Sequence, residues 1–352
     1  MDRLNKLRLV MREAELPALL VSRPANILYI SGFSGGSDGR LLITEKDAYL
    51  LTDGRYFEQA ARECAQWTVV PVKAGEPDPL LKLCAGAAEL GVEAEYISAA
   101  QYLRLQATIM PKLRDFSGAI EKMRLIKEEG ELALLRASAA ISDRVWRGML
   151  AELEPGMRED YIAARIAFRL REEGCSGEAF ATIAASGENG ALPHAHPGER
   201  RLCPGDLLTC DFGGVYLHYA GDMTRTIAVE SLSPVWRERY QRLLEVQELA
   251  VARVQAGISG EEIYHLAVRE LARYELERYF NHGLGHGVGL EVHEGPRLSA
   301  ASSDILQENM VVTVEPGIYF PGQGGIRIED TVIVNSRGCE RITRSDKILT
   351  IL

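Results

Sequence analysis

Two stretches of this sequence, residues 206–229 and 310–334, alternate between apolar and polar residues over strand-length runs. Successive side chains of a β-strand point to opposite faces, so each stretch predicts a β-hairpin with one apolar and one polar face. The polar faces carry Thr209 with Asp211, Asp222 with Thr224 and Thr226, Thr313 with Glu315, and Arg327 with Glu329 and Thr331. Each of the four strands therefore places one carboxylate on its polar face.

Two interpretations of these faces are open. Antiparallel ribbons commonly turn a polar face to water, and for any single strand this interpretation is favoured. Four carboxylates on neighbouring strands repel one another, however, and Arg327 is the one basic residue on these faces. Divalent cations would supply the missing positive charge, so the four strands together favour a metal site.

The segment "NHGLGHGVGLEVHEGP" at residues 281–296 adds three histidines. His282 and His286 have the spacing of a zinc-protease pair, but no glutamate follows His282, and the glycines between them disfavour a helix. His286 lies among glycines, where a metal can approach closely. Four carboxylates and one imidazole form a ligand set for two divalent ions of intermediate hardness, best manganese, with cobalt, zinc or iron as alternatives. We expect His293 to end a short apolar strand, "GLEV", near this site.

The rest of the chain predicts an α+β protein with two domains. Residues 1–122 alternate between helical and strand patterns, whereas residues 123–352 show two helices and a hairpin, and then repeat that order. This repetition indicates an internal duplication. The length of 352 residues suits two domains, and 46% hydrophobic with 26% charged residues is ordinary for a globular protein.

Charge and hydropathy exclude several classes of partner. A net charge of −10 argues against nucleic acid and against an anionic membrane surface. No apolar run approaches the length that spans a bilayer, and the charged first residues lack a signal-peptide core. We expect a cytoplasmic protein whose six cysteines, none in a C-x-x-C pair, are reduced.

Five motifs occur in order along the second half: "SGENGALPHA", "DFGGVYLHYAGDMTRT", "GHGVGLEVHE", "VEPGIY" and "GIRIED". With them the chain resembles the pita-bread metallopeptidases of the prolidase and aminopeptidase P group. The first half, with "NILYISGF" and "TDGRYFEQA", resembles the creatinase-type N-terminal α/β domain. The resemblance implies a catalytic domain with a curved antiparallel sheet and a pseudo-twofold repeat, and it implies a homodimer.

The resemblance also implies a role for each site residue. The metal ligands would be Asp211, Asp222, His286, Glu315 and Glu329, with Asp222 and Glu329 bridging two ions. Glu315 would also carry the proton from the attacking water to the leaving nitrogen. His194 and His293 would bind substrate and stabilise the tetrahedral intermediate.

Three more residues complete the predicted site. His282 would line the pocket beside the substrate, and Arg327 would contact the substrate region and hold a ligand carboxylate. Arg297, four residues after His293, is either a solvated loop residue or a partner for the free carboxylate of a substrate. Compact microbial prolidases are similar here, which favours Xaa-Pro dipeptides over longer Xaa-Pro peptides as substrates.

Three other proteins share parts of this pattern. A metal-free creatinase-like hydrolase and a non-catalytic pita-bread interaction protein usually lack the ligand set, whereas all five positions are filled here. A methionine aminopeptidase keeps the ligands but lacks an N-terminal domain of this kind. The sequence therefore favours a dinuclear hydrolase that cleaves the bond before proline, with aminopeptidase P as the alternative.

Overall fold

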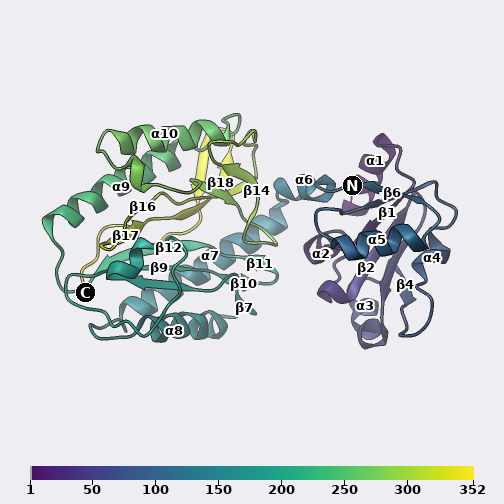
Figure 1. Cartoon of the computed structure of the whole chain (residues 1–352), viewed down its shortest axis with the longest axis horizontal. Helices are drawn as coiled ribbons and strands as arrows, with labels where there is room; N and C mark the ends of the chain where they lie inside the picture. The colour runs from purple at the N-terminus through teal and green to yellow at the C-terminus, as the bar shows by residue number, and fades with distance from the viewer. Residues whose placement is uncertain (1) are drawn as a thin grey trace. The chain divides into compact units, whose positions relative to one another are not determined.

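The computed structural model describes residues 2–352, and the chain forms two compact units, Met1–Arg124 and Leu125–Leu352 (Figure 1). The domain boundary predicted from the sequence lies between residues 122 and 123, within helix α6 (Ala119–Leu125). None of the helices among the described residues combines the length and the apolar composition needed to cross a bilayer.

The first unit is built around a six-stranded mixed sheet in the order β4-β3-β2-β1-β5-β6. Its strands are β1 Ala18–Val21, β2 Gly39–Thr44, β3 Ala48–Thr52, β4 Thr68–Pro71, β5 Glu89–Val92 and β6 Lys112–Asp115. Its helices are α1 Arg3–Glu13, α2 Pro24–Ser31, α3 Phe57–Glu63, α4 Leu80–Leu83, α5 Ala99–Thr108 and α6. The predicted alternation of helices and strands is confirmed.

The second unit contains two helix pairs, each packed against strands that follow it in the chain. The helices are α7 Glu129–Leu150, α8 Glu159–Glu172, α9 Pro234–Arg253 and α10 Gly260–Ala272. Ile162, Ile166 and Leu170 of α8 are buried in one apolar cluster, and Leu243 and Ile263 of α9 and α10 are buried in another. The order of two helices followed by paired strands therefore occurs twice, as the sequence predicts.

The strands of the second unit form the two hairpins expected from the sequence. The first runs through β9 Leu207–Phe212, β10 Gly214–Tyr216, β11 Tyr219–Ala220 and β12 Met223–Ala228, and β8 Ile183–Ser186 pairs with β9. The second runs through β15 Val311–Val314, β16 Gly317–Phe320, β17 Gly324–Arg327 and β18 Asp330–Asn335. The remaining strands are β7 Gly177–Glu178, β13 Gly285–Gly287, β14 Glu294–Leu298 and β19 Gly338–Arg341.

The polar faces of the two hairpins are buried, so the interpretation as half-exposed ribbons is wrong. Thr224 and Thr313 are 0% exposed. The two hairpins also bond to each other, because the Thr331 hydroxyl donates to the Asp222 carbonyl and the Thr226 hydroxyl donates to the Arg327 carbonyl, both at 2.8 Å. The two hairpins therefore pack against each other along part of their polar faces.

A buried ion pair on the opposite face of β12 stabilises this junction. Arg225 donates to the Thr224 carbonyl at 2.8 Å, to the Glu329 carbonyl, and to Asp330 Oδ1 at 2.9 Å. Lys347 donates to Asp330 Oδ2 at 2.6 Å, and the Asp330 side chain is 0% exposed. Arg225 and Asp330 therefore connect β12 to β18 on the face opposite the polar face of the first hairpin.

Arg225→Met should lower the free energy of unfolding by about 3–5 kcal/mol, because it removes one partner of a buried ion pair. Arg341→Met is the matched control, since Arg341 also approaches Asp330, at 3.7 Å, but its side chain is 39% exposed. The control should lower the free energy of unfolding by less than about 1 kcal/mol. Urea unfolding of the full chain measures both, and equal losses would contradict a special role for Arg225.

Candidate metal centre

A cavity of about 630 Å³ lies between the two hairpins and the segment that carries the histidines. Nine of the ten predicted site residues line it: His194, Asp211, Asp222, His282, His286, His293, Arg297, Glu315 and Arg327. The tenth, Glu329, is 1% exposed and lies behind the lining. Residues from both halves of the second unit therefore meet at one place.

Three carboxylates form a compact group at the base of this cavity. Asp211, Asp222 and Glu329 each offer one oxygen, and these oxygens lie within 4.8 Å of one another. Asp211 lies on β9, Asp222 directly precedes β12, and Glu329 directly precedes β18. The pairing of β9 with β12, and the contacts between the two hairpins, bring the three side chains together.

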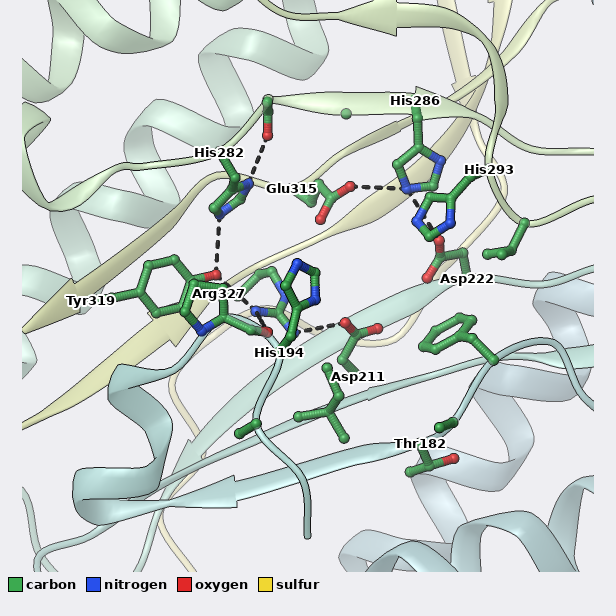
Figure 2. Close-up of a pocket in the computed structure, with 18 of the residues that line it drawn as sticks. Thr182, His194, Asp211, Asp222, His282, His286, His293, Glu315, Tyr319 and Arg327 are labelled. Atoms are coloured by element: carbon green, nitrogen blue, oxygen red, sulfur yellow. Dashed lines mark hydrogen bonds and ion pairs between the residues drawn. The ribbon is translucent and has the colours of Figure 1, made fainter. Parts of the chain in front are cut away.

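Glu315 and His286 extend the group on its other side. His286 Nε2 lies 3.1 Å from Glu315 Oε1 and 3.6 Å from Asp222 Oδ2, and Figure 2 shows the three side chains converging. The close approach of β13 to β15 requires glycine at 285, because a Cβ there would lie 2.0 Å from the Thr313 carbonyl oxygen. Thr313 Oγ1 then accepts from the His286 N–H and donates to Glu315, both at 3.1 Å.

Arg327 holds Asp211 with a charge-assisted hydrogen bond of 2.7 Å from Nη2 to Oδ2. Its Nη1 donates to the Tyr319 hydroxyl and to the Pro193 carbonyl, and its Nε donates to Thr224 Oγ1. All three nitrogens have protein partners, so the geometry favours the predicted task of holding a ligand carboxylate over direct substrate binding.

Burial and mutual repulsion dominate the electrostatics of the carboxylates. Burial, and then the neighbouring carboxylates, raise the pKa of Asp222 and of Glu329 well above the ordinary range. Burial would also raise the pKa of Glu315, but the hydrogen bond and charge of His286, with the charge of Arg327, lower it overall. The cluster of carboxylates therefore has too little positive charge around it to balance its own negative charge.

The donor set fits divalent cations. Asp211 Oδ1 and Glu329 Oε1 are buried and have no hydrogen-bond partner among the described residues. Buried carboxylate oxygens without a partner are costly, and an oxygen-rich set with one imidazole suits ions of intermediate hardness. The chemistry of these residues thus supports a metal centre at the base of the cavity.

The three other predicted site histidines, together with His196, line the cavity around this group. His282 Nε2 lies 3.1 Å from the Tyr319 hydroxyl, and the ring centroids of His286 and His293 are 4.3 Å apart. His194, which is exposed, reaches the cavity from the loop that follows β8 (Figure 2).

One local prediction near His293 is wrong. Residues 289–292, "GLEV", do not form a strand but a bend. Strands β13 and β14 are antiparallel and pair directly, so the residues between them must reverse the chain. His293 therefore lies at the end of this connection, next to the first residue of β14.

Sequence reasoning missed two groups of cavity residues. Tyr319 belongs to the motif "VEPGIY", but its contacts with His282 and Arg327 depend on three segments meeting in space. Phe180, Ile183 and Val292 add an apolar wall, and neither their spacing nor their chemistry distinguishes them from core residues.

The sequence matches two family profiles. Residues 133–336 match metallopeptidase family M24, and residues 3–126 match the creatinase/prolidase N-terminal domain. An Xaa-Pro dipeptidase of Pyrococcus horikoshii is 36% identical over 350 residues, which are 99% of this chain and 98% of that protein.

Solved structures are similar over the same extent. The Xaa-Pro dipeptidase from Bacillus anthracis is 38% identical with a TM-score of 0.96, and 99% of each chain is covered. The X-Pro aminopeptidase from Thermotoga maritima is 33% identical with a TM-score of 0.91, and 100% of each chain is covered. The chain therefore belongs to metallopeptidase family M24, and joins a creatinase/prolidase N-terminal domain to a catalytic domain that uses divalent metal ions.

Proposed function

We propose that this protein hydrolyses the peptide bond before proline in small peptides whose second residue is proline. The observation that carries the proposal is the meeting of four carboxylates and His286 at the base of a cavity that four further histidines line. The similar proteins from Pyrococcus horikoshii and Bacillus anthracis are Xaa-Pro dipeptidases, which supports the same substrate class here.

Asp211, Asp222, His286, Glu315 and Glu329 would hold two divalent ions. When bound, such ions activate a water molecule and polarise the carbonyl of the scissile bond. Manganese suits the four carboxylates and one imidazole best, with cobalt, zinc or iron as alternatives. The homodimer and the cytoplasmic location stay predictions.

Side chains of the cavity would carry out proton transfer and stabilise the developing negative charge. Glu315, with one carboxylate oxygen free of His286, takes a proton from the attacking water and delivers it to the leaving nitrogen. His194 and His293 donate to the negative charge that develops on the carbonyl oxygen. Burial lowers the pKa of His293, which favours the neutral imidazole as the donor.

Arg297 supports dipeptides as the preferred substrates. It pairs with His286 across β13 and β14, and residues directly opposite in an antiparallel pair point to the same face. Arg297 is exposed and lines the cavity on that face. A guanidinium there can bind the free carboxylate of a proline leaving group, whereas a tripeptide would place an amide at that position.

Arg297→Ala should lower kcat/KM for Xaa-Pro dipeptides by roughly ten- to a hundred-fold, the equivalent of a charge-assisted contact of ~1.5–3 kcal/mol. The same change should barely alter kcat/KM for Xaa-Pro-Xaa tripeptides. Arg337→Ala, which removes an exposed arginine in the turn between β18 and β19, is the control and should leave both values unchanged. Equal losses of kcat/KM on both substrates would show that Arg297 does not bind the free carboxylate of the dipeptide.

The alternative is an aminopeptidase P that releases the first residue from longer peptides. The likeness to the Thermotoga maritima X-Pro aminopeptidase over the full chain favours it. A panel of dipeptides and tripeptides, with proline or alanine second and with manganese or cobalt added, tests both functions. Preference for tripeptides would select the alternative, and indifference to proline would reject both.

A further inference from the structure

Residues 187–198, the first part of the connection between β8 and β9, form a loop that carries His194 over the cavity. Four consecutive residues of this loop, Pro193 to His196, line the cavity. The loop has only one short element, the 3₁₀ turn Gly187–Ala191, so its own hydrogen bonds do little to fix it. Other parts of the unit must therefore fix its position.

Glu159, the first residue of α8, contacts both ends of this loop. Its side chain is fully buried, and its Oε1 accepts hydrogen bonds from the Ser186 N–H at 2.7 Å and from the Ser186 hydroxyl at 2.6 Å. Its Oε2 accepts from the Asn189 side-chain amide at 2.9 Å and from the Gly198 N–H at 3.3 Å. One carboxylate thus bonds the residue before the loop, an early residue and its last residue.

The middle of the loop is fixed separately. Arg327 Nη1 donates to the Pro193 carbonyl at 3.2 Å, next to His194. Gly190 packs so closely on β17 that a Cβ there would lie 3.2 Å from the Gly325 nitrogen. With its centre held by Arg327 and β17, and its ends held by Glu159, the loop has one defined path over the cavity.

We propose that Glu159 is a positioning residue for His194. This inference rests on the proposed function, in which His194 stabilises charge on the scissile carbonyl. Glu159 does not line the cavity and cannot touch the substrate, so it acts only through the loop. Displacement of a catalytic group by about 1 Å can cost on the order of 10²-fold in rate. Loss of the Glu159 hydrogen bonds should therefore lower the rate.

The site requires a carboxylate and not its amide isostere. Four donors face the two oxygens of Glu159, which matches the acceptor capacity of an ionised carboxylate. In Glu159→Gln, the new NH₂ group would face either Ser186 or the pair Asn189 and Gly198. The Asn189 amide can flip and the Ser186 hydroxyl can rotate, but the backbone N–H of Ser186 or of Gly198 cannot. One backbone N–H at one end of the loop therefore loses its carboxylate acceptor, while the backbone hydrogen bond from the Asp160 N–H to the Gly198 carbonyl, at 3.0 Å, remains.

Glu159→Gln should lower kcat on an Xaa-Pro dipeptide by about ten- to a hundred-fold. Bound metal, measured by elemental analysis, should stay at the wild-type level because no proposed ligand lies on the loop. Hydrogen–deuterium exchange should become faster in residues 187–198, and this readout needs no substrate. Unchanged exchange in residues 187–198 would overturn the proposal, whether or not the protein cleaves Xaa-Pro dipeptides.

Glu93→Gln is the matched control. Glu93 is 4% exposed, and its carboxylate also accepts from two backbone N–H groups, those of Ser22 and Arg23, and from the Asn26 side-chain amide. It lies in the first unit, whereas the residues that line the cavity lie between Phe180 and Arg327. Glu93→Gln should reproduce any general cost of the substitution without changing kcat or exchange in residues 187–198.

A double-mutant cycle separates positioning from general damage. In a His194→Ala background, Glu159→Gln should lower kcat by no further factor, because the group it positions is already absent. If Glu159→Gln lowers kcat equally with and without His194, the proposal is wrong.

Should Glu159→Gln fail to fold, Asn189→Ala replaces it in the cycle. This variant removes one of the four donors and leaves the buried carboxylate with three. It should show the same pattern with a smaller loss of kcat. A Glu159→Gln or Asn189→Ala protein with wild-type kcat would equally overturn the role of Glu159.

Discussion

Glu315→Gln lowers kcat by about 10²–10⁴-fold while the chain keeps its fold and at least one metal ion; this is the result we expect from loss of a positioned proton carrier. Glutamine has nearly the shape of glutamate but cannot accept the proton of the attacking water. Asp211, Asp222, His286 and Glu329 remain as donors, so metal binding weakens without disappearing. Loss of one ligand adds to the kinetic effect.

Steady-state kinetics with elemental analysis of the same sample checks this expectation. Glu308→Gln is the matched control, because it makes the same chemical change at an exposed position shortly before β15. It should leave kcat and metal content unchanged. Near-wild-type turnover by Glu315→Gln with metal bound would show that another group moves the proton.

Chelation should abolish peptide hydrolysis and lower the melting temperature, and added manganese should restore both. Without cations, Asp211, Asp222 and Glu329 crowd their oxygens within 4.8 Å, with Arg327 contacting only one of the three. An ion at 100 times its Kd stabilises the native state by ~2.7 kcal/mol. For a domain of this size that corresponds to a rise of roughly 5–11 °C.

Thermal unfolding and activity are measured on the same dialysed protein, before and after metal is returned. Calcium serves as the control ion, because it prefers six to eight oxygen ligands and fits a centre with an imidazole poorly. Full activity in a sample that elemental analysis shows to be metal-free would end the two-metal proposal.

The strand period of two explains why so much of the site could be predicted. Once residues 206–229 and 310–334 are interpreted as hairpins, alternation alone places Asp211, Thr224 and Thr226 on one face and Cys210 in the apolar layer. The structure agrees, with Cys210 fully buried in an apolar cluster. The two helix pairs are equally visible, because the apolar stripe of α8 follows the helical period.

The remaining features depend on contacts between distant segments. The burial of the polar faces follows from the packing of one hairpin against the other, which no local sequence pattern predicts. In the sequence, Arg225 is an ordinary strand residue, and its ion pair with Asp330 is visible only in the structure. Glu159 is likewise an ordinary acidic residue in the first turn of a helix. The bend at residues 289–292 was missed because its apolar residues imitate a strand.

The order of the proposed ligands along the chain has a consequence for how the protein is made. Asp211 and Asp222 leave the ribosome first, and Glu329 follows only after α9, α10 and the histidine segment. A complete ligand set rarely exists before folding, so the nascent polypeptide offers no high-affinity place for an ion. We therefore expect metal to bind only after the second hairpin has paired with the first. If the ions supplied at that moment decide which metal is bound, expression in media with different metals should yield differently loaded protein from one sequence.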